Sequence, residues 1–163
     1  MRIDVRGSQE LQDVALAIQN SDREVRSAIR AFTKSRLTTP WLSAIANEAD
    51  TTVERRVIGS TASLSVSDQN VRIQSATKGR RLSGGLVPKV DYGAVEFGAS
   101  HRKRTYTRQG HRVTRNTTAQ FKRHNRDGYV FYEAAREMIP RLASLMVQTV
   151  VKTYADIFEG KRG

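Results

Sequence analysis

The residues of this chain best suited to a chemical role are a dense run of cations that can bind an anionic group. Between Ser100 and Arg126 lie nine Lys and Arg residues and no Asp or Glu. These cations are Arg102, Lys103, Arg104, Arg108, Arg112, Arg115, Lys122, Arg123 and Arg126. Arginine dominates, and its planar guanidinium group forms paired hydrogen bonds with a phosphate or a carboxylate. The segment therefore favours contact with a polyanion, either a nucleic-acid backbone or an acidic face of another protein.

The total charge is consistent with a polyanionic partner. The simplest alternative is that the cationic segment is a solvated loop without a partner. The formal net charge is +12 and the isoelectric point is about 10.7, so the nine cations leave the rest of the chain close to neutral. Tyr106 and Phe121 are the only aromatic residues among them. Two aromatics are few for stacking single-stranded bases, and no helix-turn-helix, zinc-finger or RNA-binding signature is present. These observations argue against sequence-specific recognition and leave phosphate contact and acidic-protein contact equally open.

Catalytic and metal-binding constellations are missing from the sequence. Asp91 and Glu96 are five residues apart on a predicted extended segment, so their side chains should point to opposite faces. The three histidines, His101, His111 and His124, lack the HxH and HxxxH spacings that place two imidazoles on one metal ion. The chain has no cysteine, which excludes disulfides and thiolate chemistry. We therefore expect no enzyme activity, no cofactor and no metal site.

Length and composition indicate one domain, residues 1–163, with a thin core. Hydrophobic residues make up 38% of the 163, and the mean hydropathy is −0.54. No apolar run approaches the roughly 18 residues that a membrane span needs, so we expect no contact with a membrane. The N-terminal residues contain no apolar stretch of signal-peptide length, and we expect a protein that is not exported. A thin core in a chain of this size often depends on a partner for stability.

Periodicity of the apolar residues predicts the elements that position the basic segment. The predicted elements are, in order, an edge strand at 1–7, helices over 9–32 with a break at 20–22, a new helix from Pro40 to about 48, a β-meander over 53–77 with a turn at 68–70, a loop at 77–89, and an extended or mixed segment at 91–98. Trp41 is predicted to be a core residue, because a lone Trp at a helix start usually anchors packing. The strongest helical pattern begins at Tyr129 and includes Pro140, which should kink it.

The basic segment itself contains the pattern of a hairpin. Residues 105–107 can lie opposite 112–114, with Gln109-Gly110 as a tight turn between them. The hairpin offers few apolar side chains for burial. We therefore expect a protruding arm that is poorly ordered in the free subunit.

The stretch KVDYGAVEFGAS, residues 89–100, resembles a segment of a known family. The small head–tail joining or tail-completion proteins of long-tailed bacteriophages have a YA-x-x-x-E-F-G type segment before a loop and a last helix. The matching residues here are Tyr92, Gly93, Val95, Glu96, Phe97 and Gly98. The order of the predicted elements is also similar. The chain differs from that pattern at about 99–127, where a long basic insertion replaces a short proline-containing stretch.

The resemblance implies an α+β fold, with a small, mostly antiparallel sheet packed against an N-terminal helical region and a long C-terminal helix. It implies a structural virion protein that forms a ring of six subunits, caps the tail tube and docks it to the head connector or stopper protein. The ring would be assembled in the host cytoplasm, and its basic arm would face the passing DNA or an acidic neighbour. Tyr92, Glu96, Phe97 and Gly98 become candidate intersubunit contacts. Glu96 would then form a salt bridge with another subunit's arginine; the alternative is a solvent-facing strand residue.

Two other functions remain open at this point. The chain could hold another place in the same neck, as a head-completion stopper or a connector adaptor. From a different class, it could be a free protein that binds nucleic acid without regard to sequence. Salt-dependent binding of duplex DNA by the monomer would favour the second of these, and ring formation would favour the tail-terminator interpretation.

Overall fold

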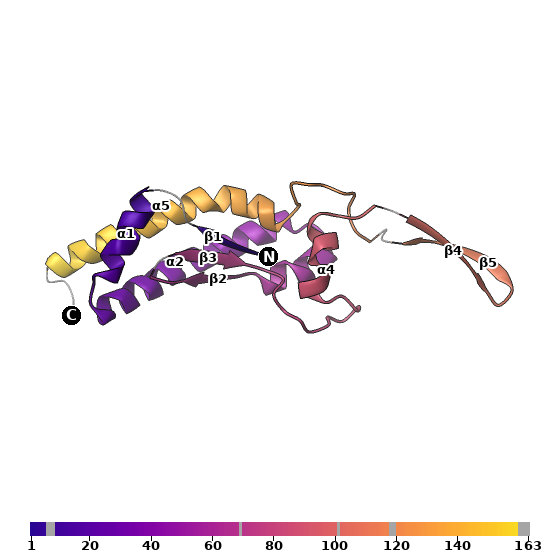
Figure 1. Ribbon diagram of the computed structural model, residues 1–163, viewed down its shortest axis with the longest axis horizontal. Coiled ribbons are helices and arrows are strands. Elements are labelled where there is room, and N and C mark those ends of the chain that lie inside the picture. Colours follow the sequence, from indigo (N-terminus) through magenta and orange to yellow (C-terminus); the bar gives the residue numbers. More distant parts are fainter. Residues whose placement is uncertain (6–8, 69, 101, 118–119, 160–163) are drawn as a thin grey trace.

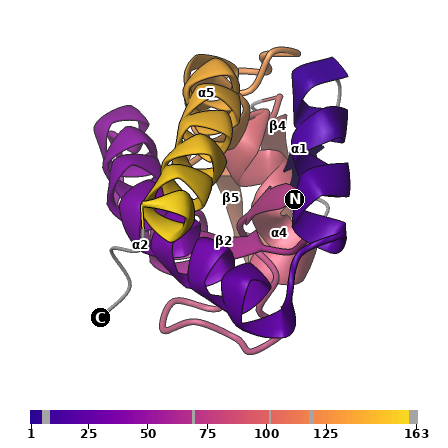
Figure 2. The ribbon, with the colours of Figure 1, turned by 90° about the vertical axis from the view of Figure 1, so that its left-hand side faces the viewer.

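The computed structural model describes residues 1–5, 9–68, 70–100, 102–117 and 120–159, and its helices and small antiparallel sheets give an α+β fold (Figure 1). The elements are β1 (Arg2–Val5), α1 (Gln9–Gln19), α2 (Arg23–Glu48), α3 (Thr52–Val57), a 3-10 turn η1 (Gly59–Thr61), β2 (Ser63–Val66), β3 (Val71–Gln74), α4 (Pro88–Glu96), β4 (Arg102–Arg108), β5 (His111–Thr117) and α5 (Phe131–Phe158). The long helices α2 and α5 pack along each other, and α5 lies between α1 and α2 (Figure 2). Within the described residues, no helix is both long and apolar enough to cross a membrane.

The three-stranded sheet packs against the two long helices. Its strand order is β1-β3-β2, and both pairings are antiparallel. The central residue Ile73 is fully buried and lies opposite Ile3 on one side and Leu64 on the other. The N-terminal edge strand and the turn between β2 and β3 are therefore confirmed. Two of the three strands are edges, which leaves a sheet with little internal support.

Helix α2 passes through Pro40, so the prediction of a new helix start there is wrong. One face of α2 is buried along its whole length, at Ile29, Thr33, Leu37, Trp41, Ala44 and Ile45. Packing of this face against α5 and β2 outweighs the one hydrogen bond that proline removes. The predicted break at 20–22 is confirmed, because α1 ends at Gln19 and α2 begins at Arg23.

Two segments predicted to be extended are helical. Residues 52–57 form α3 because Thr51 and Glu54 make a reciprocal capping box: the Thr51 amide donates to Glu54 Oε2 at 2.8 Å, and the Glu54 amide donates to Thr51 Oγ1 at 3.2 Å. The piece at 91–98 belongs to α4, which starts at Pro88. Proline suits a first helical turn, and the Asp91 carboxylate accepts a hydrogen bond from the Val87 amide.

The core is centred on Trp41, as predicted. Trp41 is fully buried, and its ring meets the ring of Phe131 edge to face, with centroids 5.5 Å apart. This contact joins the middle of α2 to the first residue of α5. Edge-to-face pairs add about 0.5–1.5 kcal/mol beyond the burial of their area. The first turn of α5 is thus fixed at the centre of the molecule, directly after the chain returns from the basic segment.

The basic segment forms the predicted hairpin. Strands β4 and β5 pair antiparallel, with Thr105 opposite Thr114 and Tyr106 opposite Val113. Gln109 and Gly110 both have positive φ, 49° and 76°, as a tight two-residue turn of this hand requires. Figure 1 shows the hairpin projecting away from the helices and the three-stranded sheet. We call residues 102–117 the basic arm.

Candidate functional site

The basic arm carries six of the nine cations that the sequence singled out. They are Arg102, Lys103, Arg104, Arg108, Arg112 and Arg115. The side chains of Lys103, Arg108 and Arg112 are exposed, and none of the three forms a salt bridge with any residue that the structure describes. For the other three the structure describes only the backbone, in which Arg104 pairs with Arg115 and Arg102 with Thr117. His101 lies outside the described residues.

The two faces of the basic arm differ in character. Paired residues of an antiparallel ladder share a face, and neighbours along a strand alternate. One face therefore carries the Thr105–Thr114 pair, whose hydroxyl oxygens are 3.0 Å apart, together with Arg112. The other carries the half-buried pair Tyr106 and Val113. The described side chains of the arm thus present cations and hydroxyl groups, with a single small apolar pair.

The two ends of the basic segment are joined where they leave the body. The Ala99 amide donates to the Lys122 carbonyl at 2.9 Å, and the Asn125 amide donates to the Phe97 carbonyl at 2.8 Å. Between them Gly98 has φ +70°, and a Cβ added there would lie 2.1 Å from the Arg123 carbonyl oxygen. Only glycine fits this crossing. The last residue of the EFG motif is therefore explained by a close approach of two backbones.

Glu96 caps the N-terminus of α5. Its fully buried carboxylate accepts hydrogen bonds from the amides of Phe131 at 2.9 Å, Tyr132 at 3.0 Å and Val130 at 3.4 Å. A carboxylate at this position also interacts favourably with the positive end of the helix dipole. Both earlier interpretations of Glu96 are wrong: the residue ends a helix instead of lying on an exposed strand, and no part of its surface is free for an intersubunit salt bridge.

Gly128 makes room for the Glu96 carboxylate. It has φ +83°, and a Cβ at this position would lie 2.4 Å from Glu96 Oε1. The turn before it is closed by Asn125, which donates to the Gly128 carbonyl at 2.9 Å and accepts from the Asp127 amide at 3.0 Å. The sequence contained a signal for this arrangement, because Asp-Gly is a typical turn dipeptide. It could not show that a side chain 32 residues earlier fills the space that the glycine leaves.

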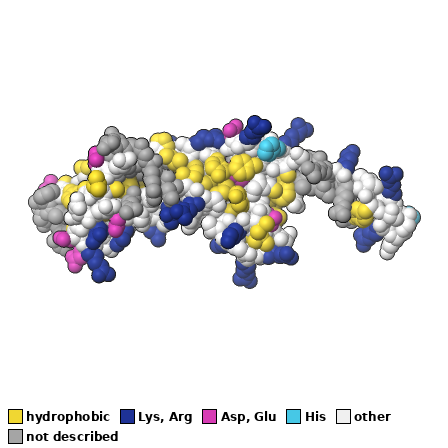
Figure 3. Space-filling model, viewed as in Figure 1, with side chains coloured by type: hydrophobic (Ala, Val, Ile, Leu, Met, Phe, Trp, Pro, Cys, Tyr) yellow, Lys and Arg dark blue, Asp and Glu magenta, His cyan; other side chains and the backbone are white. Residues whose placement is uncertain are grey.

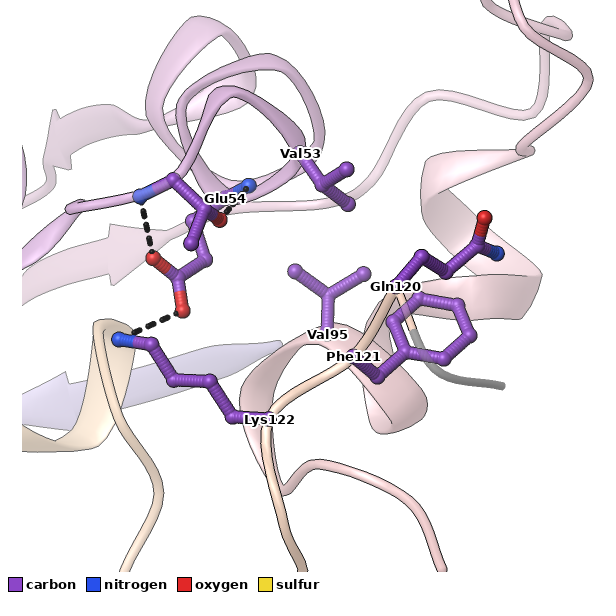
Figure 4. Close-up of a pocket in the computed structure, with 7 residues that line it drawn as sticks. Val53, Glu54, Val95, Gln120, Phe121 and Lys122 are labelled. Carbon is purple, nitrogen blue, oxygen red and sulfur yellow. Dashed lines mark hydrogen bonds and ion pairs between the residues drawn. The ribbon is translucent and has the colours of Figure 1, made fainter. Parts of the chain in front are cut away.

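Lys122 holds the returning chain against the body and does not belong to the arm. Its ammonium nitrogen lies 2.9 Å from Glu54 Oε1 (Figure 4) and 3.1 Å from Asp50 Oδ2. Burial by itself lowers the pKa of Lys122, but hydrogen bonds to Glu54 and Asp50, with the charges of both, outweigh it and raise the pKa above its ordinary value. Since its charge is neutralised within the fold, Lys122 is removed from the candidate polyanion contacts. Arg123 and Arg126 are exposed on the connection to α5.

The other motif residues pack where the arm meets the body. Phe97 lies 5.5 Å from Tyr132 between ring centroids, and Tyr92 packs half-buried against the core. Phe121 projects between Val95 and Gln120 in Figure 4. A cavity lined by Val53, Val95, Gln120 and Phe121 measures only about 10 Å³, close to the space for a single water molecule. The motif therefore builds a joint between the arm and the body.

No cluster of three or more His, Asp or Glu side chains suited to a metal ion occurs among the described residues. Comparison of the chain with models of known protein families, with curated proteins and with solved structures finds no match. The likeness to phage neck proteins accordingly depends on the motif and on the order of elements alone.

Proposed function

We propose that this protein is a structural component of a bacteriophage neck, a ring-forming subunit that terminates the tail tube and docks it to the head connector. The observation that carries the proposal is the position of the Tyr92–Gly98 motif. Its residues cap and pack the start of the last helix, at the point where the family resemblance places a loop followed by that helix.

Exposed apolar side chains support association into a ring. Leu16, Val90 and Val151 expose 57%, 74% and 62% of their surface, and they lie on three different helices. A further pocket of about 170 Å³ between α2 and α5 is lined by Phe32 and Leu145. We infer that these side chains contact the next copy in a heterologous interface, in which one surface meets a different surface of the neighbour and a ring can close.

The proposal is tested by the assembly state of the purified chain. Native mass spectrometry and negative-stain electron microscopy should show a closed ring, with six copies as the expected number. Added to tail tubes of the source virus, the ring should decorate the end that faces the head. Val151→Asp should reduce assembly, because it puts a charge into an apolar contact, whereas Ser144→Asp on the same helix serves as the control. A chain that stays monomeric alone and on tubes overturns the proposal, and attachment only to the head portal favours the stopper or adaptor.

A further inference from the structure

The charge of this molecule is divided between two parts. Residues 55–128 hold 16 of the 28 Lys and Arg residues and 4 of the 16 Asp and Glu residues, a difference of 12 that equals the whole net charge. The remaining residues hold 12 of each sign. The cationic part of the chain is therefore longer than the basic arm alone, and it includes the last three residues of α3, all of α4 and the loop between β3 and α4.

This loop is a second basic protrusion. Four exposed cations, Lys78, Arg80, Arg81 and Lys89, lie on residues 78–89, which extend into the first turn of α4 and which we call the basic loop. The loop is closed by a hydrogen bond from the Lys89 amide to the Lys78 carbonyl at 3.0 Å. None of the four cations forms a salt bridge with a described residue.

The basic loop and the basic arm lie on the same part of the molecule. Leu82 and Leu86 of the loop line a pocket of about 230 Å³ together with Arg56 of α3 and Gln120, which follows the arm. Figure 1 shows the loop and the arm on the α4 side of the body, and Figure 3 shows Lys and Arg side chains along both. Most of the acidic side chains visible in Figure 3 lie at the opposite end. The two protrusions can thus contact one extended anion together.

We propose that the basic arm and the basic loop bind the sugar–phosphate backbone of double-stranded DNA, independently of base sequence. Exposed arginine, lysine and threonine side chains are the groups that contact phosphate oxygens in protein–DNA complexes. The arm supplies Arg108, Arg112 and Thr105, and the loop supplies Arg80 and Arg81. An acidic protein is the less suitable partner for the arm, because protein interfaces have a desolvated apolar centre, and the described side chains of the arm include only one apolar pair, Tyr106 and Val113.

Duplex DNA fits the arm better than a single strand does. Tyr106 is the only aromatic residue in β4 and β5, whereas proteins that bind single strands stack successive bases on several aromatic rings. Each strand of the arm has 7 residues, and 7 residues of β-strand extend about 23 Å. The major groove, about 12 Å wide, admits a two-stranded ribbon of this kind. DNA is thus an additional ligand of the proposed neck protein. Its binding does not require ring formation, because both protrusions belong to one chain.

The experiment is a salt titration of binding to a fluorescent 30-base-pair duplex of random sequence, read by anisotropy. The logarithm of affinity should fall linearly with the logarithm of salt concentration, with a slope of about −0.9 for each phosphate contacted. The double variant Arg108→Gln/Arg112→Gln should make the slope shallower by about 2, and Arg80→Gln/Arg81→Gln should do the same. The control is Arg136→Gln/Arg141→Gln on the neutral part of the surface, where both arginines pair with glutamates; it should leave the slope unchanged.

Three outcomes overturn the inference. The first is no binding of the duplex at about 50 mM salt, where phosphate contacts are strongest. The second is the same salt slope of the affinity for the arm variant, the loop variant and the parent, and the third is tighter binding of a single strand or of poly-glutamate than of the duplex. Circular dichroism of each variant verifies that the fold is kept. A chain that binds DNA as described but forms no ring would refute only the proposed function, and a ring without DNA binding would refute only this inference.

Discussion

The carboxylate of Glu96, the last residue of α4, accepts a hydrogen bond from the backbone amide of Phe131, the first residue of α5, at 2.9 Å. The basic segment lies between these two residues, so the contact closes the 35-residue excursion on which the arm is built. Because Phe131 also packs against Trp41, the joint connects the base of the arm to the centre of the core. The base of the arm is therefore tied to the buried core.

Replacing Glu96 with Gln should lower the free energy of unfolding by about 2 kcal/mol, because the charged acceptor at the helix start is lost and an amide N–H faces other donors. Urea unfolding followed by the fluorescence of Trp41, the sole tryptophan, measures the change. Glu133→Gln on the exposed face of the first α5 turn is the control and should cost less than about 0.5 kcal/mol. Equal effects of the two substitutions would contradict the capping role.

Alanine at Gly128 should destabilise the fold by more than about 2 kcal/mol, because the residue has positive φ and its new Cβ would overlap the Glu96 carboxylate. Gly93, inside α4 with nothing within 4 Å of an added Cβ, is the matched control. Gly93→Ala should stabilise the protein by about 0.5–1 kcal/mol through helix propensity. The two substitutions should shift the midpoint of thermal unfolding in opposite directions. Unchanged stability of Gly128→Ala would disprove the close approach between Gly128 and the Glu96 carboxylate.

Lys122→Met should cost about 1–3 kcal/mol at neutral pH, because the buried Glu54 carboxylate loses its cation. The pKa of Lys122 is raised in the folded state above its ordinary 10.5, so the folded chain holds this proton more tightly than the unfolded chain. The stabilisation is complete below pH 10.5 and is lost as pH rises through the higher folded value. Between pH 8 and 12, the free energy of unfolding should therefore fall more steeply with rising pH for the parent protein than for Lys122→Met.

The neighbouring arginine is the control for that experiment. Arg123 is exposed and makes no salt bridge to a described residue, so Arg123→Met should leave both the stability and its alkaline slope unchanged within about 0.5 kcal/mol. A similar alkaline slope in the parent and in Lys122→Met would show that the ion pair does not control the pH dependence.

Removal of the arm should leave the body folded. Residues 101–119 can be replaced by Asn-Gly, because the hydrogen bond between Ala99 and Lys122 already holds the two ends together. The arm strands pack chiefly on each other, so the midpoint of thermal unfolding should change by less than about 3 °C, which corresponds to roughly 1 kcal/mol. A fall of more than about 10 °C would mean that the arm contributes to the core.

Trypsin should cut the free subunit first within the basic arm. An isolated two-stranded ribbon is marginally stable, and Lys103, Arg108 and Arg112 on it are exposed. The expected early products are two fragments separated by mass spectrometry, with cleavage between residues 102 and 115. Protection of this region in the monomer would count against the expectation that the arm is poorly ordered before assembly, and protection only in a complex would support it.

Local patterns in the sequence were sufficient for the long helix α5, the β2–β3 turn and the hairpin, but not for the continuous course of α2 through Pro40. Each of these depends on interactions between residues that are close in the chain, such as the three- and four-residue spacing on α5 or the Gln109-Gly110 turn. The concentration of cations in one segment is likewise a property of composition. The sequence alone therefore established that a basic hairpin precedes a long final helix.

The tertiary structure decided what could not be found locally. Pro40 stays inside a helix because the packing of one whole face exceeds the loss of one hydrogen bond. In the sequence, Glu96 and Lys122 look like exposed charges. Only the fold places the backbone amides of α5 next to the Glu96 carboxylate and places Glu54 next to the Lys122 ammonium group. Both partners are more than 30 residues away, and burial makes such contacts strong enough to determine where a charged side chain lies.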